Sequence, residues 1–85
     1  MAAEQKIRDY ILQNFLFSQD QSLLNSTDSL LAKGIIDSTG VMEMITFLQE
    51  EFGITVEDSE MVPENLDSVN RISAFVARKQ AAAGA

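Results

Sequence analysis

Residues 34–53 read GIIDSTGVMEMITFLQEEFG, and this stretch decides the fold. Apolar side chains recur in it every three or four positions, which is the period of an amphipathic α-helix. They are Val41, Met44, Ile45, Leu48 and Phe52. Gly53 follows the pattern directly and suits the left-handed position that often ends a helix. The spacing therefore predicts a helix over residues 38–52.

The same period predicts helices on both sides of this stretch. Residues 3–17 carry an apolar stripe, and a last helix follows Asp67 or Ser68, either of which can cap it. The inward positions are Ile7, Tyr10, Ile11 and Phe15 in the first helix and Val69, Ile72, Phe75 and Val76 in the last. Pro63 can open a single turn over residues 63–66. The expected fold is all-α, a small bundle of three main helices plus one short helix.

The connections are expected to pack onto this bundle. Residues 18–36 lack a period but hold six leucine or isoleucine residues, so the loop is predicted to be pinned to the core. Gly34 fits a turn with positive φ. Ile54 and Val56 are expected to be buried from an extended linker. We expect one domain over residues 1–80 and a frayed tail over residues 81–85.

Composition limits the chemistry. The 85 residues contain no cysteine and no histidine, which removes the commonest thiol, base and metal ligand. The net charge of −7 argues against nucleic acid as a partner. Neither an apolar signal core nor a membrane-length apolar run occurs. We expect a cytoplasmic monomer that does not insert into membranes and is not itself an enzyme.

The acidic residues are concentrated in one part of the chain. Nine acids and no base lie between positions 34 and 70. This block can be a solvated surface or a docking face for basic partners, and charge alone does not decide between them.

The approach Gly34-Ile35-Ile36-Asp37-Ser38-Thr39-Gly40, followed by an acidic amphipathic helix, resembles the acyl and aminoacyl carrier proteins. In that family an Asp-Ser pair opens the second helix, and the serine bears a 4′-phosphopantetheine arm. The resemblance places the attachment serine at Ser38 and the preceding acid at Asp37. It covers most of the chain, including the long loop, the short third helix and the last helix.

The resemblance also implies the cofactor and the partners. A phosphopantetheinyl transferase would move the arm from coenzyme A to Ser38, with magnesium held by the transferase. An adenylating acyl or aminoacyl ligase, or an acyltransferase, would load the arm as a thioester. The chain would be a freestanding carrier that shuttles acyl or aminoacyl cargo in lipid or aminoacyl metabolism. Its expected docking residues are Asp37, Thr39, Val41, Met42, Glu43, Glu50 and Glu51.

The physics of a helix start fits this interpretation. Unpaired N–H groups and the positive end of the dipole favour the negative phosphodiester of the arm, and Gly40 leaves room for close approach. A serine at a helix start can also serve only as a cap. Asp28-Ser29-Leu30 and Asp67-Ser68-Val69 are competing Asp-Ser pairs, interpreted here as turn or cap residues because neither opens an acidic helix.

One departure bears on the cargo. Fatty-acid carriers usually have leucine after the serine, whereas this chain has Thr39 and then Gly40. That pattern looks more like the D-alanyl and aminoacyl carriers that serve adenylating ligases. A specialised fatty-acyl or polyketide carrier and an unmodified acidic interaction module remain as alternatives. The methionines Met42, Met44 and Met61 are interpreted as core residues, with an adaptable binding surface as the alternative.

Overall fold

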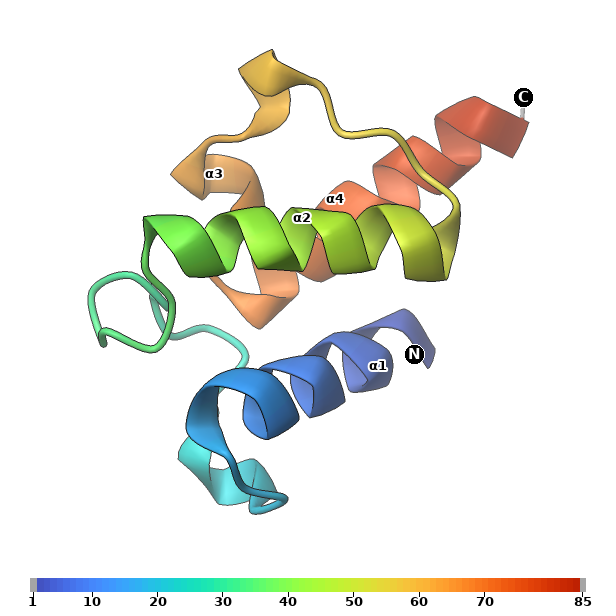
Figure 1. The fold of residues 1–85 in the computed structure, drawn as a ribbon. Helices are drawn as coiled ribbons and strands as arrows, with labels where there is room; N and C mark the ends of the chain where they lie inside the picture. Colours follow the sequence, from blue (N-terminus) through green and yellow to red (C-terminus); the bar gives the residue numbers. More distant parts are fainter. Residues whose placement is uncertain (1, 85) are drawn as a thin grey trace.

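Three long helices form the frame of the structure, a computed structural model that describes residues 2–84. They are α1 (Ala2–Ile11), α2 (Ser38–Phe52) and α4 (Val69–Gly84). Figure 1 shows α1 running in the opposite direction to α2 and α4, with the short α3 (Pro63–Leu66) beside the N-terminal end of α2. The predicted all-α bundle of three main helices and one short helix is confirmed.

The first helix ends in an unusual turn. After Ile11 the chain continues as a wider π-helical turn, η1 (Leu12–Leu16). Phe17 then takes a left-handed conformation with φ 52°, and its N–H donates to the carbonyl of Leu12. Ser18 N donates to the same carbonyl at 3.0 Å. The two N–H groups fix the end of the helix close to where the sequence predicts it.

The long loop is pinned to the bundle, as predicted. Leu24, Leu30 and Ile36 are buried in the core, although Leu23 and Leu31 stay exposed. Arg8 of α1 ties the loop down through a 2.8 Å hydrogen bond to Ser26 Oγ and further bonds to the 21–24 segment, which contains η2 (Gln21–Leu23). Gly34 has a φ of +71°, the positive value that its sequence context indicates.

Both ends of α2 follow the prediction. Asp37 is the cap residue, and its Oδ1 accepts a hydrogen bond of 2.8 Å from Gly40 N. Gly53 closes the helix with φ +66°. Ser38 is therefore the first residue inside the helix, and the alternative interpretation of Ser38 as the cap is wrong.

The C-terminal third packs back across the bundle. The linker after α2 is extended and buries Ile54 and Val56, and a short turn, η3 (Asp58–Glu60), precedes α3. Ser68 caps α4 by accepting a 3.1 Å hydrogen bond from Arg71 N. The helix α4 then continues through residues 81–84, where the sequence predicts a frayed tail, and Ala85 lies outside the described residues.

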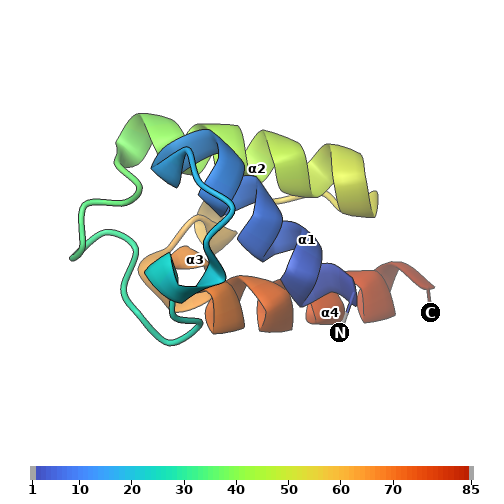
Figure 2. The same ribbon diagram turned by 90° about the horizontal axis from the view of Figure 1, so that it is seen from below.

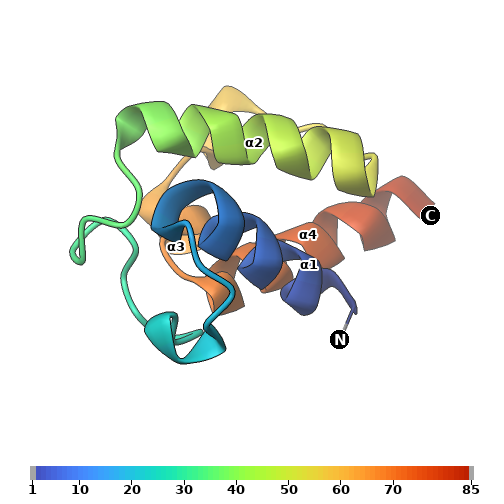
Figure 3. The ribbon, with the colours of Figure 1, turned by 60° about the horizontal axis from the view of Figure 1, so that its bottom comes forward.

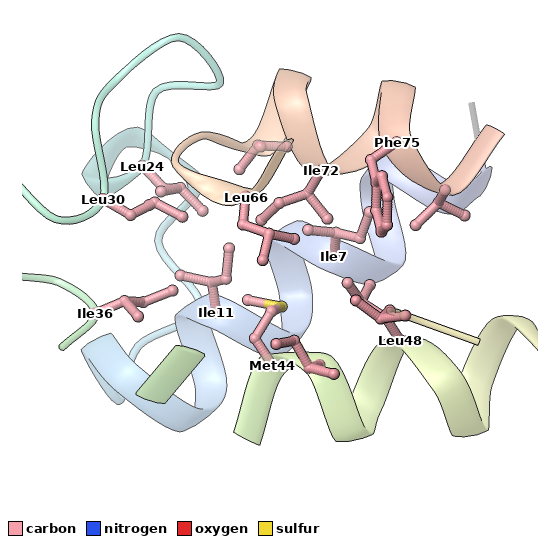
Figure 4. Close-up of a cluster of buried hydrophobic side chains, with 14 of the residues drawn as sticks. Ile7, Ile11, Leu24, Leu30, Ile36, Met44, Leu48, Leu66, Ile72 and Phe75 are labelled. Atoms are coloured by element: carbon pink, nitrogen blue, oxygen red, sulfur yellow. The ribbon is translucent and has the colours of Figure 1, made fainter. Parts of the chain in front are cut away.

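The core fills the space between the three long helices. Figures 2 and 3 show α1 lying across the side of α2 and α4. Figure 4 shows Ile7, Met44, Leu48 and Phe75 meeting from the three helices, with Leu30 joining from the loop. Burying such side chains supplies roughly 1.5–3 kcal/mol each. Within residues 2–84 no helix is long and apolar enough to cross a membrane.

Candidate functional site

The exposed N-terminus of α2 carries the candidate attachment residue. Ser38 is exposed at the first helical position, and its neighbours Asp37 and Thr39 are exposed as well. Asp37 occupies its carboxylate with the Gly40 N–H, so the cap does not depend on the Ser38 hydroxyl. A large enzyme can therefore reach the hydroxyl of Ser38 without disturbing the helix start.

The two competing serines are engaged inside the fold. Ser29 is half-buried, donates to Asp67 Oδ2 at 2.5 Å and accepts from Ala32 N at 3.1 Å. Ser68 is 4% exposed and caps α4. Asp67 further accepts a 2.9 Å hydrogen bond from Leu31 N, so its carboxylate joins the loop to the start of α4. Of the four Asp-Ser pairs in the chain, those of Ser38 and Ser59 present an exposed serine. Ser59 lies within the short turn η3, so only Ser38 combines exposure with the start of a long helix.

Gly40 has a different role from the one that its sequence position predicts. It is buried, and a β-carbon added there would lie 2.8 Å from Cε1 of Phe15 and 3.1 Å from Cγ2 of Ile36. The missing side chain therefore makes room for Phe15 of the turn η1, and the expectation that Gly40 leaves room for an outside molecule is wrong. Sequence spacing missed Phe15 here, because the two residues meet only in the tertiary structure.

An apolar groove lies beside Ser38. It has a volume of about 420 Å³ and runs between the first turn of α2, the end of the long loop and α3. Its walls include Leu31, Ile36, Val41, Met61 and Leu66, and Ser38 and Met42 line it too. Met42 is 55% exposed, so the core interpretation fails for this methionine, whereas Met44 is 1% exposed and belongs to the core.

A second groove lies between α1 and α2, away from the first. It encloses about 610 Å³, and Tyr10 and Phe47 stack there with ring centroids 4.0 Å apart. The carboxylates of Glu43, Glu50 and Glu51 line it as well. Burial raises the pKa of the Tyr10 phenol, and the charge of Glu43 raises it further.

The predicted docking residues on α2 do not share one side of the helix: Val41 and Met42 line the groove beside Ser38, whereas Glu43, Glu50 and Glu51 line the α1–α2 groove. Val41 is half-buried, and the others are exposed. Glu51 differs from Glu43 and Glu50, because its Oε1 lies 3.0 Å from Lys6 Nζ. That ion pair already offsets part of the acidic charge. Within the described residues no group of three potential metal ligands occurs.

A small all-helical bundle with an exposed Asp-Ser pair at the start of its second long helix has the architecture of a carrier domain. Comparison with known proteins agrees, although no family model matches the chain. The chain is 38% identical to a D-alanyl carrier protein of Streptococcus uberis over 72 residues, which cover 85% of this chain and 87% of that protein. It is 40% identical to a D-alanyl carrier protein of Streptococcus suis over 57 residues, or 67% and 71% of the two chains.

A broader match comes from a probable acyl carrier protein, PigG, of a Serratia species. It is 28% identical over 78 residues, which cover 92% of this chain and 88% of that protein. The chain belongs to the acyl and D-alanyl carrier protein family.

Proposed function

We propose that Ser38 bears a covalent 4′-phosphopantetheine arm, on which the protein holds acyl or aminoacyl cargo as a thioester and passes it between partner enzymes. The observation that carries the proposal is the exposure of Ser38 at the first position of a long helix. Ser29 and Ser68 are held by hydrogen bonds, and the exposed Ser59 lies in the short turn η3. The arm would supply the thiol that this cysteine-free chain lacks.

The surroundings of Ser38 suit a phosphodiester. The first N–H groups of α2 point toward this end of the helix, and the positive end of the helix dipole favours an anion there. In the transfer, the Ser38 oxygen would form a bond to the phosphorus of the pantetheine phosphate in coenzyme A. The pyrophosphate bond would break, adenosine 3′,5′-bisphosphate would leave, and the serine proton would pass to a base of the transferase.

The loading reaction belongs to a partner. An adenylating ligase would join a carboxylic acid to the AMP part of ATP with release of pyrophosphate, and would then transfer the acyl group to the arm's thiol with release of AMP. An acyltransferase would be the alternative loading enzyme. We expect this exchange to take place in the cytoplasm, with coenzyme A as the source of the arm.

Intact-mass analysis tests the attachment site. Incubation with coenzyme A, magnesium and a promiscuous phosphopantetheinyl transferase should add one arm to the unchanged chain and none to Ser38→Ala. The variant should keep its fold, because Asp37 supplies the cap. Ser29→Ala is the matched control: it should accept the arm but lose about 1 kcal/mol of stability with the bond to Asp67. Modification that persists in Ser38→Ala would contradict the proposal.

Aminoacyl or small-acid cargo is favoured over long acyl chains by Thr39. The residue is exposed beside Ser38, where a fatty-acid synthase enzyme that grips a leucine would find a short polar side chain. A fully buried leucine anchor is worth roughly 1.5–3 kcal/mol.

The cargo preference is tested by offering the pantetheinylated protein to an adenylating amino-acid ligase and to a long-chain acyl ligase. Thioester formation, followed by mass, should be faster with the first enzyme. Thr39→Leu should improve loading by the second. An unchanged rate in that variant would remove Thr39 as the cause, and efficient loading of the unchanged chain with long acyl groups would favour the lipid carrier.

A further inference from the structure

The contact between Gly40 and Phe15 joins η1 to the turn that carries Ser38. A β-carbon at Gly40 would lie 2.8 Å from Cε1 of Phe15, which is closer than real carbon contacts of this kind. It would also lie 3.3 Å from Oδ1 of Asp37, the oxygen that caps the helix through the Gly40 N–H. The edge of the Phe15 ring thus rests against the backbone of the first turn, two residues after Ser38.

Contacts within its own turn and with Tyr10 hold Phe15 in place. It lies in the π turn η1, whose end is fixed by the two N–H groups that donate to the Leu12 carbonyl. Its ring meets Tyr10 edge to face, with centroids 5.8 Å apart, and Tyr10 is stacked in turn on Phe47. Phe15 therefore has little freedom to withdraw if Gly40 gains a side chain.

From this geometry we infer that Phe15 and Gly40 are positioning residues for the modification of Ser38. The inference rests on the proposed function. The ring of Phe15 determines how closely the first turn of α2 packs against the bundle. It thereby determines where the Ser38 hydroxyl lies relative to the predicted docking residues. If this turn were displaced, the transferase could still bind the protein surface, but the Ser38 hydroxyl would no longer lie where it can react.

The principal test is steady-state kinetics of arm transfer to Gly40→Ala, with the full chain as substrate of a promiscuous phosphopantetheinyl transferase. We expect kcat to fall about tenfold or more, since misplacement of a reacting group by 1 Å can cost about a hundredfold. KM should change less, because the exposed residues that would contact the transferase remain.

Phe15→Leu combined with Gly40→Ala tests the contact itself. Leucine lacks the ring edge that the new β-carbon would meet, so the double variant should recover much of the kcat that Gly40→Ala loses. If Gly40→Ala does not fold, the double variant compared with Phe15→Leu still tests the inference: kcat values within about threefold of each other would support it, since the clash is then relieved. No recovery in the double variant would overturn it.

Gly53→Ala is the matched control at the other end of the same helix. Its φ of +66° makes alanine strained there, yet a β-carbon would meet nothing within 4 Å. It should lower the thermal midpoint while kcat for arm transfer stays near that of the unchanged chain. An equal fall of kcat in both variants would overturn the inference, because loss of stability alone would then explain it.

These measurements distinguish failure of the proposed function from failure of the positioning role alone. If the unchanged chain accepts no arm, the proposed function fails, and the positioning role with it. If the unchanged chain is modified and Gly40→Ala is modified equally fast, only the positioning role fails.

Discussion

Single side chains decide whether the serine of an Asp-Ser pair is free at the surface or engaged inside the fold. Asp37, Asp28 and Asp67 each precede a serine, but they use their carboxylates differently. Asp37 caps α2 locally, whereas Asp67 reaches across the fold to Ser29 and Leu31. The same dipeptide is thus an exposed helix start in one place and an internal tie in another.

Removal of the Asp37 cap gives a prediction at this scale. Asp37→Ala should lower the free energy of unfolding by about 1 kcal/mol, because the N–H of Gly40 loses its acceptor. Urea denaturation measures the change. Asp37→Asn keeps an acceptor oxygen and should stay close to the unchanged protein. Equal losses in the two variants would show that charge, rather than the hydrogen bond, stabilises the helix start.

The element α2 presents different chemistry on its two sides. Gly40, Met44, Ile45 and Leu48 are buried, and the acidic side faces outward. Because Glu51 is paired with Lys6, Glu43 and Glu50 are the carboxylates of the α1–α2 groove that remain for a basic partner. Electrostatic docking through these carboxylates would favour fast, weak encounters, as the proposed function requires.

Charge reversal on α2 tests this docking face. Glu43→Lys and Glu50→Lys should each raise the KM for loading of the arm roughly threefold or more at low salt, with kcat little changed. The effect should shrink as salt rises, because exposed charges are screened over about 8 Å at physiological ionic strength. Asp58→Lys on η3 changes the net charge equally and should have a smaller effect. Equal effects of all three substitutions would indicate net charge rather than a defined surface.

At the scale of the whole molecule, two ion pairs within residues 2–84 join different helical elements, Lys6 with Glu51 and Lys79 with Glu60. Glu60 of η3 accepts hydrogen bonds at 2.9 Å from Lys79 of α4 and from the backbone of Glu57. The Lys79 bond and, to a lesser degree, the Glu57 bond hold the pKa of the Glu60 carboxyl below its usual range. This contact fastens the linker between α2 and α3 onto the last helix.

A lowered pKa makes this part of the stability dependent on pH. The unfolded chain takes up the proton at higher pH than the folded chain, so the contribution is present above the ordinary pKa of 4.5 and is lost as the pH falls through the lowered value. Glu60→Gln should therefore flatten the loss of stability with acid below about pH 5. Thermal unfolding across that range measures it. Glu64→Gln removes another acid and should keep the steeper profile.

Periodicity and helix-end chemistry were sufficient to predict the three long helices and α3, but not the turns η1, η2 and η3 or the end of α4. The 38–52 helix matches α2 at both ends, because Asp37, Gly53 and the apolar spacing are local signals that act within one helix. The burial of Leu24, Leu30 and Ile36 also follows from sequence, since a loop rich in leucine and isoleucine must cover apolar surface. The resemblance to carrier proteins, and with it the candidate Ser38, rests on the same local stretch.

Contacts between distant residues were decided only by the tertiary structure. No spacing rule relates Gly40 to Phe15, Ser29 to Asp67 or Lys6 to Glu51, because these pairs meet through the packing of α1, α2 and the long loop. The groove beside Ser38 likewise needs walls from the loop, α2 and α3 at once. A sequence pattern reflects the interactions within one helix, whereas access to Ser38 depends on how the helices pack against one another.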